Sequence, residues 1–138
     1  MDIVDVADLE DRLNRCTQAA AAAGLDAVLV SPGPDLRYLT GYDAIPLERL
    51  TCLVLSTSTH PRIVVPGLEV PAALASPLGA MDVEVVAWEE TEDPFALTAS
   101  LLPVARRVAV DDHMWASKVL ALRDAMPSAL QVAAGPVV

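Results

Sequence analysis

The chain has 138 residues, of which 54% are hydrophobic, and its formal net charge at pH 7 is -10. This length predicts a single domain, residues 1–138, that buries roughly two thirds of the surface of its unfolded chain and needs no metal or disulfide to fold. Nine scattered basic residues against nineteen acidic ones exclude nucleic acid as an expected partner. No apolar run approaches the ~18–20 residues of a membrane span, so no membrane partner is expected.

The first predicted helix covers residues 6–23. Apolar residues recur there at helical spacing, with Asp5 available as N-cap and Gly24 directly after the end of the helix. Ala27 to Ser31 is a continuous apolar run too short for a helix. This run predicts a strand that is covered on both faces, as in a layered α/β fold.

A two-turn helix is predicted between Pro34, which suits a first helical turn, and Gly41, which can end the helix. Two apolar runs follow, at residues 50–56 and 62–66, and a Ser/Thr-rich turn separates them. We expect these two runs to form an antiparallel hairpin.

Beyond residue 66 the chain alternates between helical and extended patterns. Helices are predicted near residues 70–76, 94–102 and 113–126, and strands at residues 83–88, 108–110 and 130–133. Helices between strands imply crossover connections and a sheet with helices on both faces. The predicted fold class is α/β, a three-layer sandwich with a mixed, largely parallel sheet.

Two histidines are the only imidazole candidates for metal binding. His60 lies in the turn STSTHP and is interpreted as a solvated loop residue. His113 follows Asp111 and Asp112, and the sequence DDH raises the alternative of a metal site. We favour another interpretation, in which Asp112 caps the helix predicted to begin at His113, and we predict no metal ligands in this chain.

The stretch WEETEDP contains four acids directly before a predicted helix. Paired carboxylates can serve acid-base chemistry, but acids are also favourable near a helix N-terminus. We therefore favour a solvated loop for Glu89, Glu90, Glu92 and Asp93. Neither G-x-S-x-G nor a glycine-rich phosphate loop occurs, so the residues predict no catalytic constellation of their own.

The segments GLDAVLVSPGPDLRYLTGY, RLTCLVLST, PRIVVPGLE, VAVDD and ALRDAMP together resemble the N-terminal domain of the creatinase, prolidase and Xaa-Pro aminopeptidase family. The resemblance covers nearly the whole chain. It implies a non-catalytic domain without a cofactor of its own, followed after Val138 by a pita-bread domain that holds all the metal ligands.

The resemblance also implies a function for the parent protein. That protein would be an Xaa-Pro dipeptidase or aminopeptidase with two divalent metals, manganese, cobalt or zinc, that activate water for hydrolysis. This domain would support dimerisation and gate the substrate site. The implied partners are its own catalytic domain, a second copy in a homodimer, and a proline-containing peptide.

Residues 42–49 form the loop that the resemblance connects with substrate. In related enzymes the loop after YLTG approaches the active site of the other subunit, which implies that Arg49 binds a substrate carboxylate and that Tyr42 walls the pocket. The alternative is that Glu48 and Arg49 form a weak, exposed ion pair. The residues alone leave both interpretations open.

The end of the chain, AAGPVV, has two valines and no polar tail, whereas domain ends are usually polar. We interpret both valines as exposed and expect the gene to continue into the catalytic domain. The alternative is a free-standing α/β binding or assembly module. The acidic N-terminus lacks the pattern of a secretory signal, and Cys16 and Cys52 read as buried, unpaired residues, so a cytoplasmic protein is expected.

Overall fold

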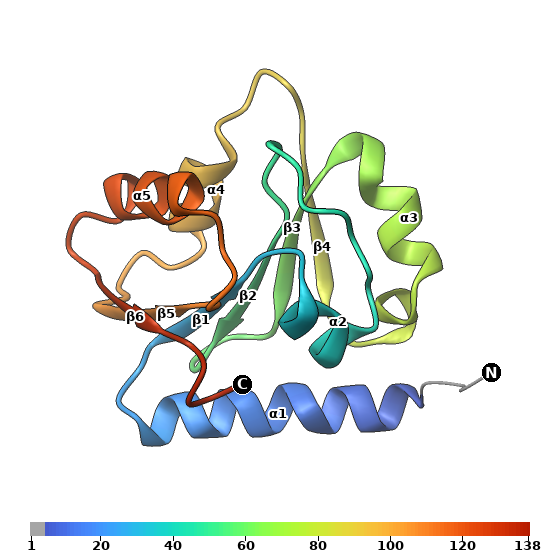
Figure 1. Ribbon diagram of the computed structural model, residues 1–138, viewed down its shortest axis with the longest axis horizontal. Coiled ribbons are helices and arrows are strands. Elements are labelled where there is room, and N and C mark those ends of the chain that lie inside the picture. The colour runs from blue at the N-terminus through green and yellow to red at the C-terminus, as the bar shows by residue number, and fades with distance from the viewer. Residues whose placement is uncertain (1–4) are drawn as a thin grey trace.

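The computed structural model describes residues 5–138. Helices and strands follow each other in the predicted order, and a six-stranded sheet lies among the helices (Figure 1). The helices are α1 (Val6–Ala22), α2 (Pro34–Thr40), α3 (Val70–Ala75), α4 (Pro94–Ser100) and α5 (Ala116–Ala125), with short 3-10 helices η1 (Gly67–Glu69) and η2 (Pro77–Ala80). The strands are β1 (Ala27–Val30), β2 (Cys52–Ser56), β3 (Arg62–Pro66), β4 (Glu84–Trp88), β5 (Arg107–Val110) and β6 (Leu130–Ala133). In the described part of the chain, no helix combines the length and apolarity needed to cross a membrane.

The strand order is β4-β3-β2-β1-β5-β6. Strand β2 runs antiparallel to both of its neighbours, β1 and β3, and the remaining pairs are parallel. The sheet is therefore mixed and largely parallel, as predicted, and the β2–β3 hairpin is confirmed. The antiparallel pairing of β1 with β2 was not predicted, because α2 and the loop that follows it separate these strands in sequence.

Two apolar cores, one on each face of the sheet, make this a three-layer fold. Alternate residues of β1 point to opposite faces. Val28 and Val30 join the core beneath α1 and α2, whereas Ala27 and Leu29 join the core beneath α4 and α5. All four side chains have no exposed surface, which explains why the strand reads as an uninterrupted apolar run.

Helix α1 begins and is buried as its spacing predicts. The Asp5 carboxylate accepts a hydrogen bond from Ala7 N–H at 3.0 Å, and the side chains that face the sheet are Leu9, Leu13, Cys16 and Ala20.

The last two residues of the chain correct the prediction that both terminal valines are exposed. Val137 and Val138 are partly buried and pack against the same core, with the chain end lying beside α1 (Figure 1).

Helix α5 begins at Ala116 rather than at His113, so the predicted cap is wrong. Residues 111–114 form a turn, in which Met114 N–H donates to Asp111 C=O at 3.2 Å. The Asp112 carboxylate accepts a hydrogen bond from Gly135 N–H at 3.0 Å instead of capping the helix. A tertiary partner thus uses the carboxylate that local sequence assigns to the helix start.

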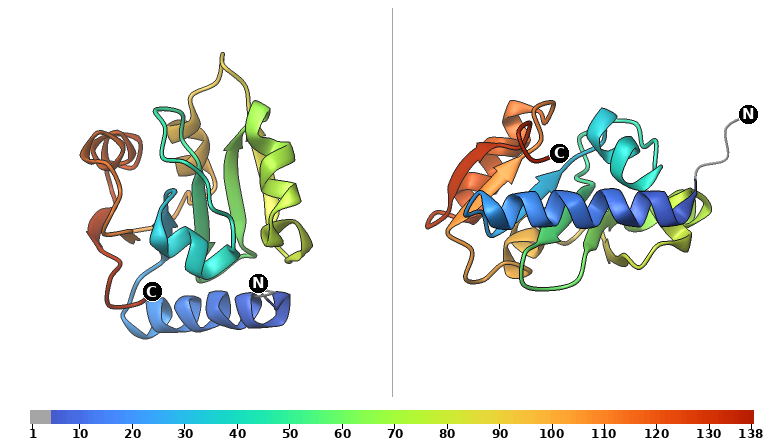
Figure 2. Two further views of the ribbon diagram at one scale, coloured as in Figure 1. Left: turned by 45° about the vertical axis from the view of Figure 1, so that its right-hand side comes forward. Right: turned by 90° about the horizontal axis from the view of Figure 1, so that it is seen from below.

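The connections at the carboxyl ends of the parallel strands carry most of the polar clusters of the domain. The segments before β2 and after β4 extend together beyond the sheet, away from α1, in both Figure 1 and the left view of Figure 2. Strands β1 and β5 are parallel neighbours, but β1 leads to α2 on one face and β5 leads to α5 on the other. In open α/β sheets, such a divergence is the usual place for a ligand crevice.

Candidate functional site

The loop of residues 42–49 is fixed at both ends and exposed in the middle. Gly41 ends α2 with a φ of 72°, a conformation that strongly favours glycine. Tyr42 is buried and its N–H donates to Thr40 Oγ1 at 3.1 Å, while Leu50 is fully buried at the other end. Between them, Ile45 is 74% exposed. The loop therefore presents its central side chains to the surroundings from a rigid base.

Arg49 forms an ion pair with Glu90. This partner lies in the acidic loop after β4, so the predicted alternative of a pair with the adjacent Glu48 is not what the structure contains. Behind the ion pair, Trp88 Nε1–H donates to Leu50 C=O at 2.9 Å in a buried hydrogen bond. This bond joins the end of β4 to the residue that follows Arg49 and sets the spacing of the two loops.

The acidic loop is solvated and precedes a helix, as predicted. Asp93 caps α4, accepting hydrogen bonds from Phe95 N–H at 2.9 Å and Ala96 N–H at 3.3 Å. Glu92 accepts from Glu89 N–H at 2.9 Å, which closes the turn between them. Glu92 and Asp93 thus have backbone partners within this segment, whereas Glu90 pairs with Arg49 of the other loop, and the acids do not form an acid-base pair.

Tyr42 and Arg49 occupy different environments. Tyr42 is 6% exposed and packs in the core beneath α1 and α2. Burial, and to a smaller extent the Glu69 carboxylate, raise the pKa of its hydroxyl. Arg49 is exposed at the far end of the loop. The two predicted site residues therefore share one loop, with Tyr42 at its buried base and Arg49 at the surface.

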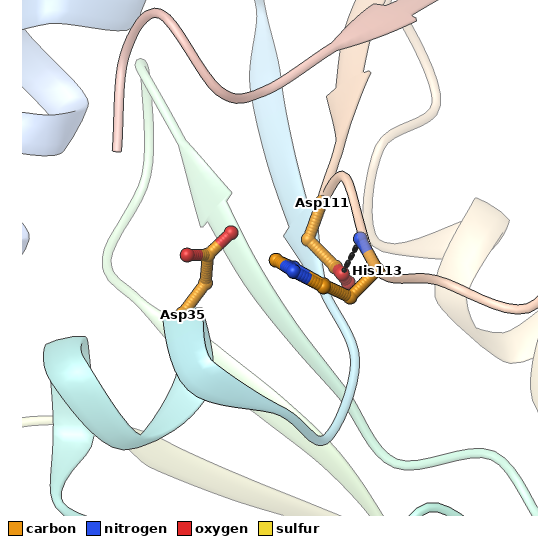
Figure 3. Close-up of side chains that lie close together, drawn as sticks. All are labelled: Asp35, Asp111 and His113. Atoms are coloured by element: carbon orange, nitrogen blue, oxygen red, sulfur yellow. Dashed lines mark hydrogen bonds between the residues drawn. The ribbon is translucent and has the colours of Figure 1, made fainter.

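A second cluster lies where β1 and β5 diverge (Figure 3). Asp111, at the end of β5, is 4% exposed. Its Oδ2 accepts hydrogen bonds from Ser31 N–H and Ser31 Oγ–H, each at 2.7 Å, and its Oδ1 accepts from His113 N–H at 2.8 Å. The His113 ring reaches toward the Asp35 carboxylate, which comes from the first turn of α2. The sequence placed Asp111 beside His113, but no local pattern pointed to Asp35.

This cluster is the one group of three metal-type ligands found among residues 5–138, since ligand atoms of Asp35, Asp111 and His113 lie within 4.8 Å of one another. Asp111 already accepts three hydrogen bonds. The cluster is therefore distinct from the two-metal hydrolytic centre, which the family resemblance places in the catalytic domain.

The charges of the cluster affect one another. Partial burial and the nearby Asp111 raise the pKa of Asp35, while the positive field of His113 lowers it in part. The hydrogen bonds of Asp111 with Ser31 and with His113 N–H join the end of β1 to the turn after β5.

Lys118 is a buried ionisable residue that the sequence pattern did not single out. It lies on α5, is only 3% exposed, and places its Nζ 4.7 Å from the centre of the Trp115 ring. Burial lowers the pKa of this amine, and the nearby Cys52 and Asp111 oppose that effect. Its position in the pattern of α5, where every third or fourth residue faces the sheet, is the signal that predicts its burial.

Comparison with known proteins identifies the fold and its relatives. The sequence model of the Creatinase/Prolidase N-terminal domain matches residues 12–138. Over 118 residues the chain is 40% identical to the probable dipeptidase PepE of Mycobacterium bovis, a match that covers 83% of this chain and 31% of the relative. The chain therefore spans about a third of the length of the curated relatives that it matches.

Solved structures agree with this assignment. The dipeptidase PepE of Mycobacterium ulcerans superposes with a TM-score of 0.91 at 39% identity, covering 99% of this chain and 37% of that one. A proline dipeptidase from Streptococcus pneumoniae has a TM-score of 0.78 at 28% identity and covers 90% of this chain and 91% of the other. Both comparisons extend over nearly all of the sheet and its helices.

Proposed function

This chain belongs to the creatinase/prolidase N-terminal domain family, and we propose that it is the non-catalytic domain of a proline-specific dipeptidase or aminopeptidase. In this role it supports dimerisation and gates the substrate site. The relatives named as dipeptidases support the activity of the parent protein. The single observation that carries the gating role is the loop of residues 42–49, which presents Arg49 at the surface from a buried base.

Arg49 is the residue proposed to bind the substrate. Its planar guanidinium can hold a carboxylate by two parallel hydrogen bonds, and a dipeptide that ends in proline offers such a group. Tyr42 was expected to wall the pocket, but it is 6% exposed, and we propose that it anchors the base of the loop that carries Arg49. The substrate carboxylate would lie beyond the sheet, outside this domain and within reach of a neighbouring one.

Exposed apolar residues support an assembly at this end of the domain. Ile45 and Leu47 are 74% and 46% exposed on the loop, and Leu68 is 79% exposed beside Arg49. Apolar groups in such positions commonly mark a contact with a partner. We propose that the partner is the catalytic domain of a second copy in a homodimer.

The hydrolytic chemistry belongs to the proposed catalytic domain. Two divalent metals, manganese, cobalt or zinc, would activate the attacking water there, and the residues of this chain would position the peptide. The two buried, free cysteines suit the reducing cytoplasm proposed as its location. The alternative, a free-standing binding module, predicts a stop codon after Val138; a downstream open reading frame with two Asp, one His and two Glu ligands supports the peptidase.

The test is hydrolysis of alanyl-proline by the full-length protein that contains this domain. We expect Arg49→Ala to lower kcat/KM at least tenfold, mainly through KM, because a two-pronged charged contact is lost. Arg15→Ala is the matched control, since Arg15 lies on α1 in an exposed pair with Asp11 at 3.0 Å. An unchanged kcat/KM in Arg49→Ala would refute the substrate role.

A further inference from the structure

The acidic loop after β4 contains one carboxylate whose only recorded partner is Arg49. Glu92 and Asp93 accept backbone hydrogen bonds within their own loop and helix. The Glu89 carboxylate lies against Gly67, where an added Cβ would approach its Oε1 to 2.9 Å. Within residues 5–138, Glu90 is left to interact with the guanidinium of Arg49.

The backbone on both sides of this ion pair is held by hydrogen bonds. Trp88 and Leu50 are 6% and 0% exposed, and the hydrogen bond between them joins the two loops two residues from Glu90 and one residue from Arg49. Glu92 N–H donates to Glu89 C=O at 2.8 Å, which fixes the turn that carries Glu90. The ion pair is therefore placed by the fold, although both of its side chains remain largely exposed.

The nitrogen through which Arg49 contacts Glu90 determines how a second carboxylate can bind to Arg49. A guanidinium has two edges that can bind a carboxylate by two hydrogen bonds. One edge consists of Nε and Nη2 and the other of Nη1 and Nη2, so both include Nη2. Glu90 contacts Arg49 at that same nitrogen. A substrate carboxylate that binds Arg49 by two hydrogen bonds must therefore displace Glu90 or tolerate a like charge beside it.

We infer that Glu90 is an internal substitute for the substrate carboxylate, a positioning residue that occupies Arg49 until a peptide replaces it. This inference rests on the proposed function of Arg49. Substrate and the released proline both carry a carboxylate, so Glu90 weakens the binding of both. The expected benefit is faster product release and less occupation of Arg49 by unrelated anions.

The experiment uses the full-length protein and the variant Glu90→Gln. We expect KM for alanyl-proline and the inhibition constant of free proline to fall together by about two- to fivefold, the range of an exposed ion pair. For alanyl-prolinamide, which has no carboxylate, KM should stay the same. Glu90→Asp should restore wild-type values because it returns the charge.

Two comparisons separate this effect from a change in folding or net charge. Glu92→Gln removes the same charge from the same loop without touching Arg49, so its KM should equal that of the wild type. In an Arg49→Ala background, Glu90→Gln should have no further effect on KM. A Glu90→Gln variant with unchanged or higher KM for alanyl-proline would overturn the inference.

The outcomes also distinguish this inference from the proposed function. If Arg49→Ala leaves KM unchanged, the substrate role of Arg49 fails, and the role of Glu90 fails with it. If Arg49→Ala raises KM but Glu90→Gln does not lower it, Arg49 binds the substrate and only the competition by Glu90 is refuted.

Discussion

The carboxylate of Asp111 at the end of β5 holds the end of β1 through Ser31, whose N–H and hydroxyl both donate to Asp111 Oδ2 at 2.7 Å. These two residues are eighty positions apart in the chain. Their contact joins the carboxyl ends of β1 and β5, where the chain continues to α2 on one face of the sheet and to α5 on the other. Asp111 is therefore better explained as a structural carboxylate than as a metal ligand.

We predict that Asp111→Asn lowers the free energy of unfolding by about 2–3 kcal/mol. The amide keeps one acceptor oxygen, but its NH₂ group then faces either the donors of Ser31 or the N–H of His113. Urea unfolding followed by circular dichroism measures the change. Asp112→Asn is the control, because Asp112 is exposed and accepts a single hydrogen bond from Gly135; we expect its loss to stay below about 1 kcal/mol. Equal losses in the two variants would contradict this account.

Gly41 sets the start of the loop that carries Arg49. We predict that Gly41→Ala destabilises the domain by more than Gly24→Ala, although both glycines have left-handed φ angles of 72° and 76°. The reason is that a Cβ on Gly41 would lie 2.8 Å from Pro77 Cγ, whereas a Cβ on Gly24 would meet only the Arg107 side chain at 4.0 Å. Each should lose about 1–2 kcal/mol from strain, and Gly41→Ala about 1 kcal/mol more. Thermal unfolding of the two variants tests this order.

We predict that Lys118 lowers the free energy of unfolding of the domain at neutral pH. Its side chain is 3% exposed, and no hydrogen bond or ion pair is recorded for it among the described residues, so we expect Lys118→Met to raise the free energy of unfolding by about 1 kcal/mol at pH 7. A less stable variant would show that the Trp115 face and Asp111 outweigh the loss of hydration.

The same residue predicts a pH dependence. Burial lowers the pKa of Lys118 in the folded state below its unfolded value, so between these two values the unfolded chain binds more protons. The contribution of Lys118 to stability therefore increases as the pH rises toward about 10.5. The stability difference between Lys118→Met and the wild type should shrink over that alkaline range. A difference that is constant with pH would refute the lowered pKa.

The chain of 138 residues by itself should not hydrolyse alanyl-proline in the presence of manganese. Asp35, Asp111 and His113 supply too few free ligand positions, and Asp111 is already occupied by three hydrogen bonds. Release of proline measured against a blank without protein is the direct test. Calorimetric titration with Mn²⁺ completes it, and a tightly bound equivalent that disappears in His113→Ala would contradict the prediction.

Local sequence was sufficient wherever a structural feature depends on neighbouring residues. The spacing of Leu9, Leu13 and Cys16 predicted the buried face of α1, and Asp93 before Pro94 predicted the start of α4. The apolar run from Ala27 predicted a strand covered on both faces. Such features follow from periodic burial and from unpaired backbone groups at helix ends, which act over a few residues.

The sequence by itself also determined that this chain holds Arg49 on a loop between a short helix and a buried strand. Only the tertiary structure decided that Glu90, rather than Glu48, pairs with Arg49, and that Asp112 binds Gly135 N–H instead of capping a helix. The physical reason is that strand order places residues from distant segments side by side. A carboxylate then binds whichever donor the packing brings within reach, and no local spacing encodes that donor.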